Sequence, residues 1–148
     1  CTMLLNKKLA GLSDPVPCEA ENHDFWIVLA ALANGAKFRY LPEPLIRYRQ
    51  HSTNVSGSYK NSGFLQRVRR FTNRSELKYI ASRKSMLIRL VARFQNEMNP
   101  SETALVKGYL GALEKGGVRA AGYAVKHGLR RRGWPQTLLF YFNLLRVR

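Results

Sequence analysis

One carboxylate stands at a position where it could act as a general base. Asp24 follows Asn22 at the start of an apolar run that ends at Gly35. Because Asn is a good N-cap and Gly commonly follows a helix C-terminus, the run predicts a helix with Asp24 in its first turn. The free N–H groups of that turn favour the ionised carboxylate, which can take a proton from an attacking hydroxyl group. The alternative is that Asp24 only caps the helix.

A second group of polar side chains alternates along residues 45–51. A strand has a side-chain period of two, so Arg47, Arg49 and His51 would share one face of it. Guanidinium groups bind phosphate oxygens, and an imidazole can ligate a divalent metal ion. The same pattern is also typical of an exposed basic strand edge. No Asp or Glu is clustered near His51, although hard cations prefer carboxylate ligands.

Trp26 lies two residues after Asp24 and has two interpretations. An aromatic face can stack on a sugar ring, which would place Trp26 at a binding site. An aromatic side chain at the start of an apolar helix can equally be part of a hydrophobic core. The sequence leaves both interpretations open.

The elements around these residues predict an α/β pattern that gives way to helices. Short apolar runs at residues 2–6 and 38–41 predict strands, besides the one at 45–51, and residues 7–21 predict a loop because they contain Gly and Pro. From residue 64 onward apolar residues recur at helical spacing, and Asn99-Pro100-Ser101 marks the start of one helix. The next helix is marked by Val118, Ala121, Val125 and Leu129 and is predicted to end before Gly133.

The charge is distributed unevenly along the chain. The sequence has 25 Lys and Arg against 9 Asp and Glu, a net charge of +16. Residues 1–57 hold six basic and five acidic side chains, whereas residues 58–148 hold nineteen and four. The second part therefore predicts an anionic partner. No helix-turn-helix, zinc-finger or RNA-binding signature appears, so nucleic acid is not the partner we expect.

The last segment could contact a membrane surface. Arg130-Arg131-Arg132 and Trp134 precede the apolar run QTLLFYFNLLRVR, which is shorter than the roughly 20 residues that span a bilayer. Cations beside aromatic and aliphatic residues are typical of an interfacial anchor on anionic lipid. A core helix or a dimer helix is the alternative.

Residues 22–57, NHDFWIVLAALANGAKFRYLPEPLIRYRQHSTNVSG, resemble family 2 glycosyltransferases of the GT-A fold, most closely the bacterial rhamnosyltransferase-like members. The resemblance lies in the order of the parts. His-Asp-aromatic-Trp opens a helix, Gly closes it, a strand and a Pro-flanked turn follow, and Tyr-Arg-Gln-His, Asn and Gly come last. It implies an α/β fragment, mainly helical with a few short strands. Residues 1–57 would be the C-terminal part of a GT-A catalytic domain, with the acceptor side and the donor-diphosphate loop, and residues 58–148 a basic α-helical region.

The resemblance also implies roles for single residues. Asp24 matches the catalytic base of inverting members, and His51 matches the histidine that approaches the metal ion and the donor diphosphate. Two further groups would line the site, namely the donor-diphosphate residues Arg49, Gln50 and Asn54 and the acceptor residues His23 and Trp26.

The implied activity is transfer of a sugar from a nucleotide-diphosphate sugar to a saccharide or lipid-linked acceptor, with Mg²⁺ or Mn²⁺, in the synthesis of bacterial surface polysaccharide or lipopolysaccharide. The implied location is cytoplasmic, peripheral at the inner face of the plasma membrane. No Asp-x-Asp metal motif occurs in these 148 residues. We therefore expect a missing N-terminal half to carry it, and this piece alone to be inactive. The alternative function is a basic helical module that binds nucleic acid or drives oligomerisation without catalysis.

Overall fold

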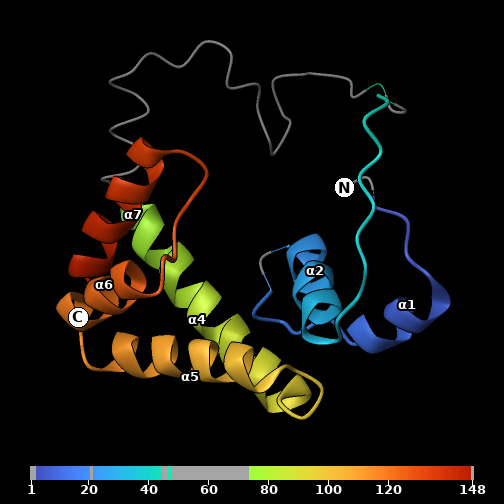
Figure 1. The fold of residues 1–148 in the computed structure, drawn as a ribbon, viewed down its shortest axis with the longest axis horizontal. Helices are drawn as coiled ribbons and strands as arrows, with labels where there is room; N and C mark the ends of the chain where they lie inside the picture. The colour runs from blue at the N-terminus through green and yellow to red at the C-terminus, as the bar shows by residue number, and fades with distance from the viewer. Residues whose placement is uncertain (1–2, 21, 45–46, 48–73, 148) are drawn as a thin grey trace.

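A computed structural model of the chain describes residues 3–20, 22–44, 47 and 74–147. These residues form helices joined by turns and irregular segments. Figure 1 shows α4 running between the pair α1 and α2 on one side and the pair α6 and α7 on the other, with α5 lying across one end. The helices are α1 (Lys7–Ser13), α2 (His23–Ala33), α4 (Arg74–Phe94), α5 (Pro100–Glu114), α6 (Gly117–Lys126) and α7 (Trp134–Leu145).

The predicted α/β fold is wrong for the part of the chain that the structure describes. Residues 3–6 and 38–41 are not strands, and no sheet of a GT-A domain is seen among the described residues. A short apolar run forms a strand only where a neighbouring strand receives its backbone hydrogen bonds. Here the side chains of Leu4 and Tyr40 are 96% and 86% exposed, so these segments are not covered either. Except for Arg47, the strand predicted at 45–51 lies outside the described residues.

The helix predicted after Asn22 is confirmed as α2. The helix ends at Ala33 with Asn34 as its C-cap, and Gly35 follows with a φ of 62°, in the left-handed region that glycine adopts without strain. The helix start predicted at Asn99 is also confirmed, because the Asn99 side-chain oxygen accepts a 3.0 Å hydrogen bond from the backbone N–H of Ser101 in α5.

The loop predicted for residues 7–21 contains a helix, α1. Asn6 caps it, since its side-chain oxygen accepts a 2.8 Å hydrogen bond from the backbone N–H of Leu9. At the other end the Ser13 hydroxyl donates to the carbonyl oxygen of Leu9 at 2.9 Å. The proline-rich segment that follows α1 is irregular, as expected.

One hydrophobic core joins the two parts of the chain that differ in charge. It consists of buried side chains from α2, from α4 and from the turn after α4, namely Trp26, Ala30, Ala33, Met86, Leu90, Phe94 and Met98. The expected boundary near residue 57 lies outside the described residues. Helices from either side of that boundary nevertheless share this core.

A second hydrophobic core lies where α6 packs against α5 and α7. Its buried members are Ile80, Leu113, Ala120, Ala121, Ala124 and Leu144. Of the residues that marked this helix in the sequence, Val118 and Val125 are 74% and 58% exposed, so they do not belong to its buried face. Small alanine side chains allow the neighbouring helices to approach α6 closely, and the larger valines face outward.

Candidate functional site

The site begins at the N-terminal end of α2, where Asp24 lies in the first turn. One carboxylate oxygen of Asp24 accepts a 2.8 Å hydrogen bond from the backbone N–H of Phe25. The N-cap residue Asn22 makes no side-chain capping bond. Asp24 therefore satisfies one of the free N–H groups of this turn, as the capping interpretation expects.

Capping does not use the whole carboxylate. An ionised carboxylate has about four lone-pair sites on its two oxygens, and the bond to Phe25 occupies one of them. Asp24 is half-buried rather than enclosed, and His23 beside it is exposed. The arrangement can therefore still accept a proton or a hydrogen bond from a molecule outside the chain.

Trp26 lies in the core and not on the surface. Its side chain is 1% exposed, and its indole N–H donates a 2.9 Å hydrogen bond to the carbonyl oxygen of Ser13. The ring packs against Phe94 of α4 with centroids 6.1 Å apart. Of the two interpretations of Trp26, this placement favours the core, since no ring face is left for a sugar.

A cation lies over the side chain next to Asp24. The guanidinium carbon of Arg83 in α4 is 4.7 Å from the centroid of the Phe25 ring and 5.8 Å from that of Tyr79. Such cation–π contacts hold a positive charge near the start of α2. The sequence pattern did not single out Arg83, because the contact joins residues far apart in the chain.

Two further arginines of α4 form hydrogen bonds with the segment that leads into α2. Arg89 binds Glu19 through two nitrogens, with Nε 2.9 Å and Nη2 2.8 Å from Oε1. This hydrogen-bonded ion pair lowers the pKa of Glu19 and raises that of Arg89. Arg93 donates to the backbone carbonyl oxygens of Asp14 and Pro15. Arg89 and Arg93 therefore attach residues 14–19 to α4, shortly before α2 begins.

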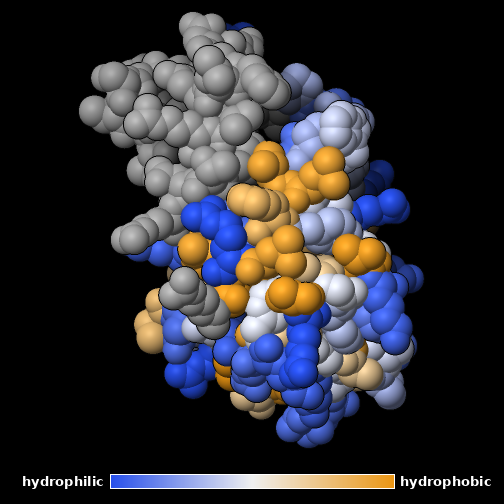
Figure 2. Space-filling model, turned by 90° about the vertical axis from the view of Figure 1, so that its left-hand side faces the viewer, coloured by the Kyte–Doolittle hydropathy of each residue, from blue (hydrophilic) through white to orange (hydrophobic). Residues whose placement is uncertain are grey.

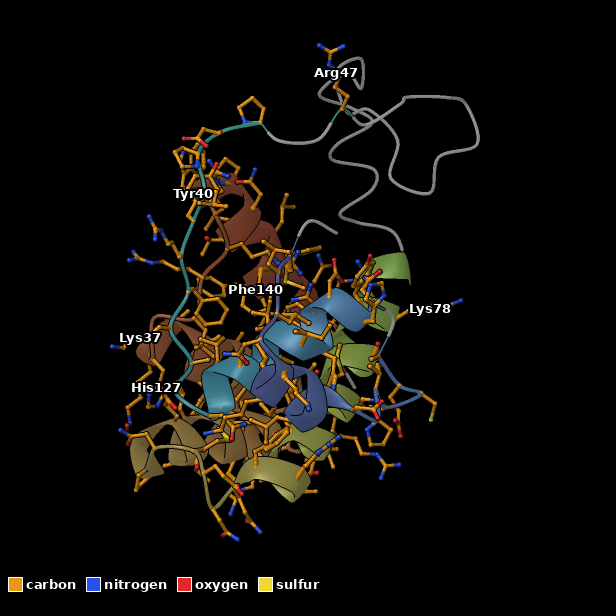
Figure 3. The ribbon with its side chains drawn as sticks, turned by 90° about the vertical axis from the view of Figure 1, so that its right-hand side faces the viewer. Lys37, Tyr40, Arg47, Lys78, His127 and Phe140 are labelled. Carbon is orange, nitrogen blue, oxygen red and sulfur yellow. The ribbon has the colours of Figure 1, made fainter. Side chains whose placement is uncertain are left out.

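The donor side of the predicted site cannot be placed. Arg49, Gln50, His51 and Asn54 lie outside the described residues, so their roles stay predictions. Arg47 is described and exposed, and Figure 3 shows it well away from the helices of the core. Tyr40, on the segment that leaves α2, is also exposed on this side of the molecule (Figure 3).

A metal site was expected from the resemblance. The described residues contain no group of three or more His, Cys, Asp or Glu side chains that could hold a metal ion. The residues in this part of the chain therefore do not fit a metal, and we derive no step through one. Among the same residues, no helix combines the length and the apolar character needed to cross a membrane.

Comparison of the chain with models of protein families, with curated proteins and with solved structures finds no match. The functional interpretation therefore depends on the residues themselves and on the resemblance noted for residues 22–57.

Proposed function

We propose that this chain takes part in glycosyl transfer, with Asp24 as the general base toward a saccharide or lipid-linked acceptor. The observation that carries this proposal is the position of Asp24, half-buried in the first turn of α2 with lone pairs left for a second partner. The order of residues from His23 to Gly57 supports it, because the other parts of the resemblance follow this carboxylate along the chain.

In the proposed reaction, an acceptor hydroxyl attacks the anomeric carbon of a nucleotide-diphosphate sugar. A new C–O bond forms as the bond from that carbon to the diphosphate oxygen breaks, and the diphosphate leaves with the bonding electrons. The hydroxyl proton passes to the Asp24 carboxylate, which makes the attacking oxygen more nucleophilic.

The proposal assigns the acceptor, but not the donor, to the described residues. His23 is the exposed neighbour that would border the acceptor, whereas Trp26 is buried in the core beneath α2 and would not reach the acceptor. The nucleotide and its Mg²⁺ or Mn²⁺ need carboxylate ligands. The sequence has no Asp-x-Asp motif, and the described residues contain no carboxylate cluster that could hold a metal ion. We therefore propose that those carboxylate ligands come from polypeptide other than these 148 residues, while Arg49, Gln50, His51 and Asn54 keep their predicted roles on the donor side.

The experiment is the substitution Asp24→Asn in the complete encoded protein. The amide side chain keeps an oxygen for the N–H of Phe25 but cannot take a proton, so the fold should persist while transfer falls. General bases contribute about 10²- to 10⁴-fold, and we expect a loss in that range. The measurement is release of nucleoside diphosphate from a panel of nucleotide sugars in the presence of membrane extracts as acceptor.

The matched control is Glu102→Gln, because Glu102 is the acidic residue in the first turn of another helix, α5. It loses a similar helix-dipole interaction without touching the site, so transfer should stay within about twofold of the unsubstituted protein. Full transfer by folded Asp24→Asn would remove the assigned base. Absence of transfer by the unsubstituted complete protein would instead leave the alternative, a basic helical module without catalysis.

A further inference from the structure

One face of α7 carries large hydrophobic side chains that stay exposed. They recur at steps of four, four and three residues, which places them on a single helix face. We call these residues the α7 stripe: Trp134 is 76% exposed, Leu138 57%, Phe142 49% and Leu145 50%. The other face of α7 is already used, since Leu144 is fully buried in the second core. Figure 2 shows hydrophobic side chains gathered on this side of the molecule, among hydrophilic ones.

All charged side chains in the last part of the chain, which contains the α7 stripe, are basic. No Asp or Glu follows Glu114, whereas eight basic residues do, namely Lys115, Arg119, Lys126, Arg130, Arg131, Arg132, Arg146 and Arg148. Arg130 and Arg132 are exposed just before α7 begins. At its other end the guanidinium carbon of Arg146 lies 5.8 Å from the centroid of the Phe142 ring. The stripe, about 17 Å long from its residue spacing, thus has positive charge at both ends.

We propose that the α7 stripe binds the surface of an anionic lipid bilayer, with α7 lying flat in the interface. The 12 residues of α7 are too few to cross the bilayer, which takes about 20. A flat helix instead buries its apolar face among the acyl chains while the flanking arginines contact lipid phosphates. Trp134, at the basic end of the stripe, would lie at the headgroup level where indole rings are favoured.

Two other occupants fit the surface less well. A second copy of the chain would bring its own cations against these cations, and like charges in contact oppose association. Nucleic acid would match the charge, but Leu138 and Leu145 offer it neither hydrogen bonds nor an aromatic face for stacking. An anionic membrane satisfies the apolar side chains and the cations together.

Vesicle binding by the 148-residue chain tests the proposal. We expect it to sediment with vesicles of equal phosphatidylcholine and phosphatidylglycerol, to bind phosphatidylcholine alone poorly, and to detach in high salt. The double variant Leu138→Ser/Phe142→Ser should bind at least about tenfold more weakly, because it removes exposed apolar area. Its control is Ile88→Ser, at a 46% exposed residue of α4, which should bind as the unsubstituted chain does.

The role of charge is tested separately. Each cation near an anionic surface strengthens binding roughly fivefold, so Arg130→Glu/Arg132→Glu should weaken it more than about 25-fold. Lys7→Glu/Lys8→Glu makes the same change in net charge on α1, where both lysines are exposed, and should have a much smaller effect.

Fluorescence gives a readout at the stripe itself. The chain has two tryptophans, and Trp26 is already 1% exposed, so a change of emission on binding reports Trp134. We expect a blue shift with anionic vesicles and quenching by brominated acyl chains, both of which Trp134→Phe abolishes. The glycosyl-transfer proposal uses other residues, so the two can fail independently.

Three results would overturn the proposal. One is equal vesicle binding by the stripe variant and the unsubstituted chain. Another is a dimer in light scattering that the stripe variant converts to monomer, with no binding to vesicles. The third is tighter binding to an oligonucleotide than to vesicles, unchanged by the stripe substitutions.

Discussion

The indole N–H of Trp26 donates a hydrogen bond to the carbonyl oxygen of Ser13, thirteen residues earlier, at 2.9 Å. Ser13 is the last residue of α1, and its own hydroxyl donates back to the carbonyl oxygen of Leu9. The indole ring packs on Phe94 of α4. A single side chain of α2 thus joins three helices, and it supports the turn that carries Asp24.

Replacing Trp26 by Phe should destabilise the fold. The change removes the bond to the Ser13 carbonyl and leaves a space beside Phe94, so we expect the free energy of unfolding to fall by about 2–3 kcal/mol. Urea denaturation followed by far-UV circular dichroism measures it. Trp134→Phe, at a 76% exposed residue, should change stability by less than about 0.5 kcal/mol. Equal stability of Trp26→Phe and the unsubstituted chain would contradict the structural role.

Helices that begin or end at recognisable capping residues could be predicted from the sequence. Asn22 and Gly35 delimit α2, and Asn99 with Pro100 marks the start of α5, because these residues have local conformational preferences that act within one turn. A strand depends on a partner strand elsewhere in the chain, which a local pattern does not reveal. The apolar run at 38–41 is not a strand. Likewise the buried side chains of α6 are alanines while its valines are exposed, which depends on the helices that pack against it.

Arg89 should hold the Glu19 carboxyl in its ionised form. Their hydrogen-bonded pair lowers the pKa of Glu19 below its ordinary value of 4.5. A carboxyl whose pKa is lower in the folded than in the unfolded state contributes stability above the unfolded pKa, and that contribution is lost as pH falls through the folded pKa. We therefore expect the pair to stabilise the chain above a pH of about 4.5 and to stop doing so in more acidic solution.

An NMR titration of the side-chain carboxyl carbon measures the pKa of Glu19 directly. Arg89→Gln should raise that pKa toward 4.5. Lys78→Gln removes another exposed cation of α4 and should leave the pKa of Glu19 almost where it was. Identical Glu19 titrations in the Arg89→Gln variant and in the unsubstituted chain would show that the pair does not form in solution.

Gly117 should not tolerate a side chain. Its backbone N–H donates to the carbonyl oxygen of Val147 at 2.9 Å, and a methyl group at Gly117 would overlap the carbonyl oxygen of Leu144. We expect Gly117→Ala to lower the free energy of unfolding by about 1–3 kcal/mol, because α6 and α7 must move apart. Thermal denaturation measures the change.

Gly122 provides the comparison within the same helix. A methyl group there meets nothing within 4 Å, and Ala is the better helix former, so Gly122→Ala should stabilise the chain by about 0.5–1 kcal/mol. Opposite signs at the two glycines are the expected result. Equal effects would mean that α6 and α7 are not in contact at Gly117.

Less of the candidate site than of the fold could be predicted. Asp24 was found because a helix start is a local pattern, whereas Trp26 could not be assigned to surface or core until its partners Ser13 and Phe94 were known. Arg83 and Arg89 act on residues 58 and 70 positions earlier, which no spacing rule connects. The α7 stripe needed the structure as well, because an apolar run in sequence does not say which of its faces the core uses.

Tyr109 should make the chain less stable in alkaline solution. Burial of Tyr109 between α5 and its neighbours raises the pKa of its hydroxyl above 10.0, and the nearby charges of Arg131 and Arg83 oppose this only in part. The unfolded chain then loses the tyrosine proton before the folded chain does. Stability is unaffected below a pH of about 10 and falls as pH rises beyond it, because ionisation favours the unfolded state.

Tyr109→Phe removes this contribution, so its free energy of unfolding should fall less steeply between pH values of about 9 and 11.5. The measurement is urea denaturation across that range, compared with Tyr40→Phe, where the replaced side chain is 86% exposed. Tyr40→Phe should run parallel to the unsubstituted chain, and parallel curves for Tyr109→Phe as well would mean that the Tyr109 hydroxyl remains in water.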